Sequence, residues 1–98
     1  RNRIGDWEGD TIIGKGHQGA IVTLTERKSG FLVMKKVVRK TAHEVHQAIV
    51  SGLLCYQDRV HTITSDNGKE FTNHQKIAED LEARFYFAHP YSSWERGT

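Results

Sequence analysis

Two aspartates stand out because of where they lie relative to the apolar segments around them. Asp10 interrupts a run of Trp, Thr and Ile residues, where aspartate is a poor strand former, and Asp66 comes just after the predicted strand 60–64. Carboxylates brought close together repel each other unless one is protonated or a divalent cation binds between them. A pair of Mg²⁺ ions held in this way activates a water or hydroxyl and stabilises the leaving oxygen in phosphoryl transfer. We therefore interpret Asp10 and Asp66 as candidate metal ligands. The alternatives are a solvent-facing residue of an edge strand for Asp10 and a simple Asp-Asn-Gly turn for Asp66.

The four residues after Asp66 are candidates for supporting roles at the proposed metal site. Asn67 and Gly68 supply a turn that directs Asp66 outward. Lys69 is a candidate phosphate contact, with a solvated lysine as the alternative. Glu70 is either a partner that orients a metal ligand or a surface charge.

His43 and His46 form a second possible metal site. Their spacing resembles the HExxH motif of zinc proteases with one residue deleted, and it still allows both side chains to share a helix face. A catalytic zinc site usually has three protein ligands, and no third ligand is evident nearby. Glu44 is better explained as part of a helix cap. We therefore do not assign zinc to these histidines.

Basic residues gather in and around the segment 31–38. They are a candidate track for a DNA backbone, or the lysines that commonly protect an exposed sheet edge. These residues are Arg27, Lys28, Lys35, Lys36, Arg39 and Lys40.

The elements that must position these side chains begin with strands. Residues 7–13, 20–25 and 31–38 are rich in β-branched and aromatic residues between turn sequences. Residues 26–30 (ERKSG) are typical of a hairpin loop. Three consecutive antiparallel strands are therefore expected.

After Lys40 the apolar period changes from two residues to about 3.6. Thr41 with Glu44 fits a capping box, in which the Thr hydroxyl accepts a backbone N–H bond and the Glu reaches back. The helix predicted to follow has one apolar face. The members of this face are Ala42, Val45, Ile49, Leu53 and Tyr56.

The rest of the chain alternates between strands and a helix. Residues 60–64 predict a fourth strand and residues 84–87 a fifth. Between them, Thr72 with Gln75 predicts a capped helix through Leu81. The order β-β-β-α-β-α-β indicates an α/β fold with a mixed five-stranded sheet and flanking helices.

Length and composition narrow the class of protein. The 98 residues allow one small domain, and 37% hydrophobic with 27% charged residues is typical of a soluble globular fold. No apolar run approaches the roughly 18–20 residues of a membrane helix. Cys55 is the only cysteine, which excludes an intramolecular disulfide and a cysteine-based zinc cage. A net charge of +2 permits nucleic-acid contact without demonstrating it.

Three segments carry a family resemblance: WEGDTI at residues 7–12, SDNGKEF at 65–71 and HPYSSWERGT at 89–98. In this order they resemble the catalytic core of bacterial DDE transposases of the insertion-sequence-thirty type, relatives of the retroviral integrases. The similarity covers nearly the whole chain, and the last two segments are its specific part. The resemblance implies a ribonuclease H-like fold, in agreement with the order of elements above.

The resemblance also implies a chemistry. Asp10 is then the first and Asp66 the second metal-binding carboxylate, with Mg²⁺ or Mn²⁺ as cofactor and two ions in the complete site. Family members hydrolyse a phosphodiester at the transposon end, and the freed 3′-hydroxyl attacks target DNA. The implied activity is that of a polynucleotidyl transferase in DNA transposition, recombination and integration.

The third acidic residue of the family lies on a helix, at a distance from Asp66 that falls beyond Thr98. Glu95 is a tempting substitute, but it belongs to the loop sequence WERG and comes too early, so we do not assign it. We therefore expect residues 1–98 to be a transposase core truncated before the third acidic residue. We expect this stretch alone to be inactive.

The last segment contains three further candidate DNA contacts. Arg96 suits a phosphate and Trp94 suits a stacked base. His89 lies in the same loop and is a candidate contact to DNA or to the scissile phosphate. For His89 and Trp94 the alternative is a structural role within the loop.

The implied partners are transposon-end and target DNA, with a homo-oligomer as the active complex, no membrane contact, and the bacterial cytosol as location. Two other functions stay open. One is a ribonuclease H-like nuclease without strand transfer, and the other is a non-catalytic DNA-binding or assembly fragment.

Overall fold

A computed structural model describes residues 3–14 and 19–88 of the chain. The elements, in chain order, are β1 (Asp6–Ile13), β2 (Ala20–Glu26), β3 (Leu32–Val37), α1 (Ala42–Leu53), the 3₁₀ helix η2 (Leu54–Arg59), β4 (Thr62–Ser65), the 3₁₀ helix η3 (Lys69–Phe71), α2 (His74–Leu81) and β5 (Arg84–Phe87). The predicted order β-β-β-α-β-α-β is confirmed, and the strand ends differ from the predicted ones by only one or two residues.

The five strands form one mixed sheet in the order β3-β2-β1-β4-β5. The first three strands pair antiparallel, whereas β4 is parallel to both β1 and β5. The predicted antiparallel meander and mixed sheet are therefore confirmed. Because β1 is the central strand, it joins the meander to the parallel part of the sheet.

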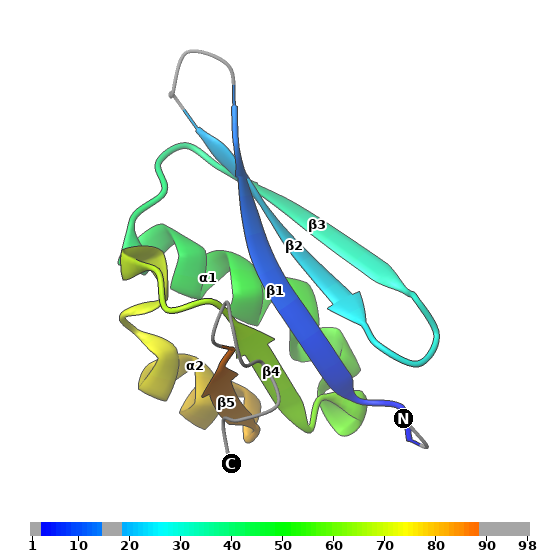
Figure 1. Cartoon of the computed structure of the whole chain (residues 1–98). Helices are drawn as coiled ribbons and strands as arrows, with labels where there is room; N and C mark the ends of the chain where they lie inside the picture. Colours follow the sequence, from blue (N-terminus) through cyan, green and yellow to red (C-terminus); the bar gives the residue numbers. More distant parts are fainter. Residues whose placement is uncertain (1–2, 15–18, 89–98) are drawn as a thin grey trace.

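Both helices lie on the same face of the sheet, where α1 packs against β3 and α2 against β5 (Figure 1). The period-2 alternation of the strands directs every second side chain to this face. Residues Ala20, Val22 and Leu24 of β2 are buried there, and the residues between them are partly exposed on the other face. The core therefore lies between the sheet and the two helices, and in the described part of the chain the other sheet face has no helix over it.

The first helix ends earlier than its apolar pattern predicts. The α-helix stops at Leu53, and Tyr56 lies in the 3₁₀ helix η2, where its φ of −110° and ψ of 20° are not helical. The Tyr56 ring packs instead against Trp7 and Phe31, with ring centroids 6.3 and 5.4 Å away. The change of backbone after Leu53 thus removes Tyr56 from the α1 face and brings it to the strands.

The second helix begins one residue later than predicted. Thr72 does not cap it: the Thr72 hydroxyl donates to the Lys69 carbonyl at 2.6 Å and closes η3. The N-cap position of α2 belongs to Asn73, whose side chain makes no capping bond. The Thr72–Gln75 cap was therefore wrong, because a short 3₁₀ turn occupies the hydroxyl.

None of the helices within the described ranges is long and apolar enough to span a membrane.

Candidate active site

Asp10 lies in the middle of β1 on the exposed face of the sheet. Its neighbours Gly9 and Thr11 point to the helix-covered side, so the alternation of the strand turns Asp10 away from the core. The Thr11 backbone N–H donates to Asp10 Oδ1 at 2.8 Å. The strand thus tolerates a poor strand former because its carboxylate faces outward.

Asp66 directly follows β4 and is exposed. The Gly68 backbone N–H donates to Asp66 Oδ1 at 2.9 Å, which closes an Asx turn over Asn67. The sequence interpretation of Asn67 and Gly68 as the turn that orients Asp66 agrees with this geometry. In the same loop the Ser65 hydroxyl donates to the Asp66 carbonyl at 2.9 Å.

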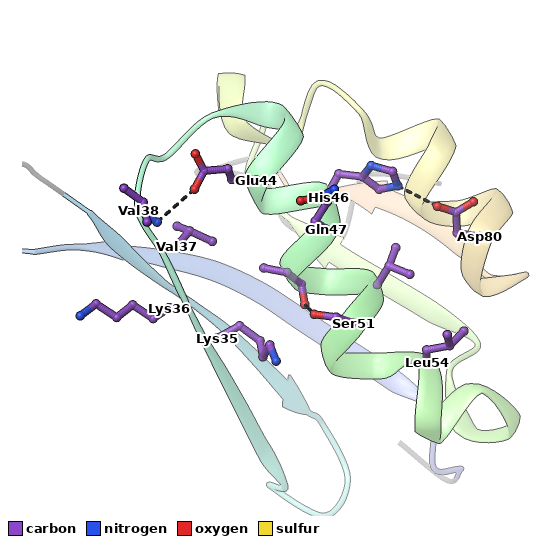
Figure 2. A pocket seen from close by; sticks show the side chains of 12 residues that line it. Lys35, Lys36, Val37, Val38, Glu44, His46, Gln47, Ser51, Leu54 and Asp80 are labelled. Carbon is purple, nitrogen blue, oxygen red and sulfur yellow. Dashed lines mark hydrogen bonds and ion pairs between the residues drawn. The ribbon is translucent and has the colours of Figure 1, made fainter.

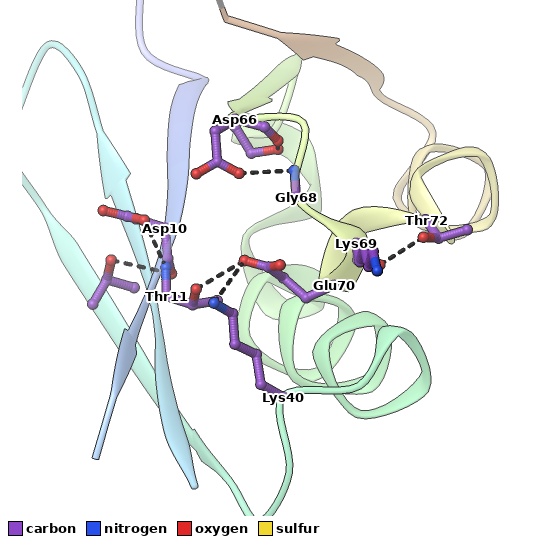
Figure 3. Close-up of polar contacts among 10 residues, drawn as sticks. Asp10, Thr11, Lys40, Asp66, Gly68, Lys69, Glu70 and Thr72 are labelled. Atoms are coloured by element: carbon purple, nitrogen blue, oxygen red, sulfur yellow. Dashed lines mark hydrogen bonds and ion pairs between the residues drawn. The ribbon is translucent and has the colours of Figure 1, made fainter. Parts of the chain in front are cut away.

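The parallel pairing of β1 with β4 brings the two aspartates to the same end of the sheet. Asp6 pairs with Thr62 and Glu8 with Thr64, so the register continued by two residues sets Asp10 level with Asp66. Figure 3 shows both side chains on neighbouring segments at this end of the sheet. Carboxyl ends of strands in open α/β sheets are a common location for active sites.

The donor set of this site fits a hard divalent cation. Each aspartate uses one carboxylate oxygen for a local backbone bond, and the other oxygen has no hydrogen bond among the described residues. In that part of the chain, no group of three or more His, Cys, Asp or Glu side chains is arranged to hold a metal. Mg²⁺ is usually held by one or two carboxylates together with waters and substrate phosphates, so two aspartates suffice for a substrate-assisted site.

Glu70 has surroundings that its sequence position did not reveal. Its side chain is only 8% exposed and accepts a hydrogen bond from the Thr11 hydroxyl at 2.9 Å. Lys40 Nζ lies 3.5 Å from the same carboxylate oxygen (Figure 3). The interpretation of Glu70 as a surface charge was therefore wrong. Its carboxylate is buried and contacts Thr11, the residue that follows Asp10.

Lys69 is exposed in η3, three residues after Asp66, and its side chain makes no ion pair among the described residues. Its position leaves the charge available to solvent or to a ligand. His89, Trp94, Glu95 and Arg96 lie outside the described residues.

The two histidines of α1 have different surroundings. His46 Nε2 lies 2.7 Å from Asp80 Oδ2, which links α1 to α2 (Figure 2). His43 is exposed. The carboxylate of Glu44 accepts bonds from the backbone N–H groups of Val38 and Arg39, both at 3.0 Å. His46 and Glu44 thus have structural partners in the fold.

The basic residues around β3 do not form one continuous track. Lys35 lies half-buried against Gly52 of α1, whereas Lys36 is exposed, and Figure 2 shows the two side chains leaving β3 in different directions. Arg27 pairs with Glu8 at 3.3 Å, and Lys40 is engaged by Glu70. Because β3 is an edge strand, this arrangement agrees better with edge protection than with a DNA track.

Comparisons with known proteins show the family of this chain. The profile of the integrase core domain family matches residues 2–93. The chain is 48% identical over 97 residues to the transposase for insertion sequence element IS4351 from Bacteroides fragilis, covering 99% of this chain and 30% of that protein. It is 31% identical over 99 residues to transposase InsI for insertion sequence element IS30A from Escherichia coli K12, covering all of this chain and 26% of that protein. The chain thus spans less than a third of the length of these relatives.

Solved structures share the fold. The catalytic core domain of BIV integrase has a TM-score of 0.70 and 25% identity, over 89% of this chain and 56% of that one. The catalytic core domain of HTLV-2 integrase, solved in complex with magnesium, has a TM-score of 0.72 and 17% identity, over 87% of this chain and 61% of that one. The predicted ribonuclease H-like fold is therefore confirmed.

Proposed function

This chain belongs to the integrase core domain family, and on that premise we propose that it is the catalytic core of a DDE transposase. The proposed activity is metal-dependent hydrolysis of a phosphodiester at transposon ends, followed by strand transfer of the freed 3′-hydroxyl into target DNA. The observation that carries the proposal is the parallel register of β1 and β4, which, continued by two residues, sets Asp10 level with Asp66.

In this proposal Asp10 and Asp66 hold Mg²⁺ or Mn²⁺, two ions in the complete site. The metal supplies stabilisation of the charge that develops on the attacking and leaving oxygens of the phosphate. The protein keeps the two carboxylates oriented through the N–H groups of Thr11 and Gly68. These bonds use one oxygen of each aspartate and leave the other to the cation.

Residues 1–98 form, in this proposal, one catalytic-core unit that contributes two of the three acidic ligands of the family. Glu95 is not assigned as the third. We propose DNA as the partner, a homo-oligomer as the active complex and the bacterial cytosol as the place of action. Lys69, His89, Trp94 and Arg96 are the proposed DNA contacts.

A chimera tests this function in a complete enzyme. Residues 1–98 would replace the matching 97 residues of the Bacteroides fragilis transposase, and purified protein would be incubated with labelled element-end DNA and Mn²⁺. We expect nicking and joining by the chimera, and loss of both to background after Asp66→Asn. Asp58→Asn changes an exposed aspartate of η2 in the same way and should retain activity.

The products of the same assay separate the alternatives. Nicking without joining favours the nuclease. DNA binding without nicking by every variant favours a non-catalytic module. Full activity of the Asp66→Asn chimera contradicts the assignment of the site.

A further inference from the structure

Glu70 joins its own loop to two other parts of the chain. Its Oε2 atom accepts a hydrogen bond from the Thr11 hydroxyl of β1 and lies 3.5 Å from Nζ of Lys40, which precedes α1. Glu70 itself lies in η3, in the loop that follows Asp66. The side chain is 8% exposed, and a carboxylate buried to this degree is stable only with such partners.

Two residues that contact Glu70, Thr11 and Gly68, each also donate a backbone hydrogen bond to one of the two aspartates. Thr11, whose hydroxyl binds Glu70, also donates its backbone N–H to Asp10. Gly68, whose N–H binds Asp66, packs against Glu70: a Cβ built on Gly68 would lie 2.5 Å from Glu70 Oε1 and 3.0 Å from Asp66 Oδ1. A shift of Glu70 would therefore move the partners of both aspartates.

We propose that Thr11, Lys40 and Glu70 are positioning residues that set the spacing of Asp10 and Asp66 for a divalent cation. This inference rests on the proposed function, since it takes the aspartate pair as the metal site. In this proposal Lys40 acts on Glu70 in two ways. Its charge offsets that of Glu70, and its ammonium group keeps the carboxylate turned toward Thr11 and away from the cation.

Two substitutions distinguish positioning from a simple effect of charge. Thr11→Val removes the hydroxyl with no change of charge and suits a strand. Lys40→Met removes a positive charge near the site, so electrostatics alone would make a cation bind more tightly. If these residues position the aspartates, both substitutions weaken binding.

The experiment is a Mn²⁺ titration of the chain, followed by the paramagnetic broadening of the backbone amide signals of Asp10 and Asp66. We expect Thr11→Val and Lys40→Met each to raise the Kd for Mn²⁺ about tenfold, the lower end of the range for residues that orient metal ligands. Thr11→Ser keeps the hydroxyl and should bind Mn²⁺ as the unmodified chain does. Unchanged signals from distant residues in the same spectra would show that each variant is folded.

Thr25→Val and Lys76→Met are the matched controls, because neither side chain makes a hydrogen bond or ion pair among the described residues. They should leave the Kd unchanged. An unchanged Kd in Thr11→Val, or tighter binding in Lys40→Met, overturns the positioning role while the metal site stands. No broadening at Asp10 and Asp66 in the unmodified chain contradicts the metal site itself, and the positioning role falls with it.

Discussion

At the scale of single residues, acidic side chains of this chain differ because their surroundings differ. Asp10 is exposed, and Glu70 is buried beside a lysine. Glu26, at the end of β2, is only 1% exposed. Burial alone would raise the pKa of Glu26, but bonds donated by Ser29 and Gly5 outweigh it and lower the pKa to about 2. The sequence placed Glu26 in a hairpin loop, although it continues the alternation of Ala20, Val22 and Leu24.

The lowered pKa of Glu26 predicts a pH dependence of stability. A group whose pKa is lower in the folded protein stabilises the fold above its ordinary pKa of 4.5, and this contribution is lost as the pH falls toward 2. Glu26→Gln should therefore lower the free energy of unfolding at neutral pH. The difference from the unmodified chain should narrow between pH 4.5 and pH 2. Urea unfolding across this range measures it.

Glu79→Gln changes an exposed glutamate of α2 and is the control. Its stability should follow the pH curve of the unmodified chain. Parallel curves for Glu26→Gln and the unmodified chain would show that the Glu26 carboxylate does not contribute in its charged form.

At the scale of elements, the start of α1 is hydrogen-bonded to the segment between β3 and α1, which contains Lys40. The Glu44 N–H donates to Thr41 Oγ1 at 3.2 Å, so one half of the predicted capping box is present. The other half is wrong, because the Glu44 carboxylate reaches past Thr41 to the N–H groups of Val38 and Arg39. The N-terminus of α1 and the end of β3 are thus tied together on both sides of Lys40.

Thr41→Ala should lower the free energy of unfolding by about 1 kcal/mol, the usual cost of losing an N-cap. Thr72→Ala is the comparison, because the Thr72 hydroxyl donates to the Lys69 carbonyl and caps no α-helix. It should change stability by less than about 0.5 kcal/mol. Urea denaturation of both variants checks the difference. Equal losses would contradict the capping role of Thr41.

At the scale of the whole molecule, the two faces of the sheet are unequal. Leu24 of β2 is fully buried under the helices, whereas Leu32 of the neighbouring strand β3 is 49% exposed on the other face. Ile12 and Met34 are also more than half exposed. The stability of the described fold therefore comes mainly from the helix-covered face.

Replacing the two leucines measures this inequality. Leu24→Ala should lower the free energy of unfolding by about 2–5 kcal/mol, because it leaves a cavity in the core. Leu32→Ala should cost less than about 1 kcal/mol, because solvent replaces the lost contacts. Similar losses for both variants in urea titrations would mean that the second face is covered as well.

The order of elements was accessible from the sequence, and the two aspartates could be proposed from it, because the rules behind both are local. Alternation, helical period and turn residues act over a few neighbouring positions, and these predicted five strands, two helices and the Asp66 turn. Where a local rule had a competitor, as at Thr72 and Tyr56, the prediction was wrong. At Tyr56 a 3₁₀ helix replaced the expected α-helical backbone, and at Thr72 the hydroxyl that was expected to cap α2 closes the 3₁₀ helix η3 instead.

The tertiary structure alone decided which of these residues meet. The hydrogen bond from Thr11 to Glu70 joins positions 59 residues apart, and the pairing of β1 with β4 sets Asp10 level with Asp66. No periodicity specifies such pairs, because they depend on the order of strands in the sheet and on the burial that packing creates. For that reason the sequence identified the two aspartates, and only the fold assigned partners to Glu70 and buried Glu26.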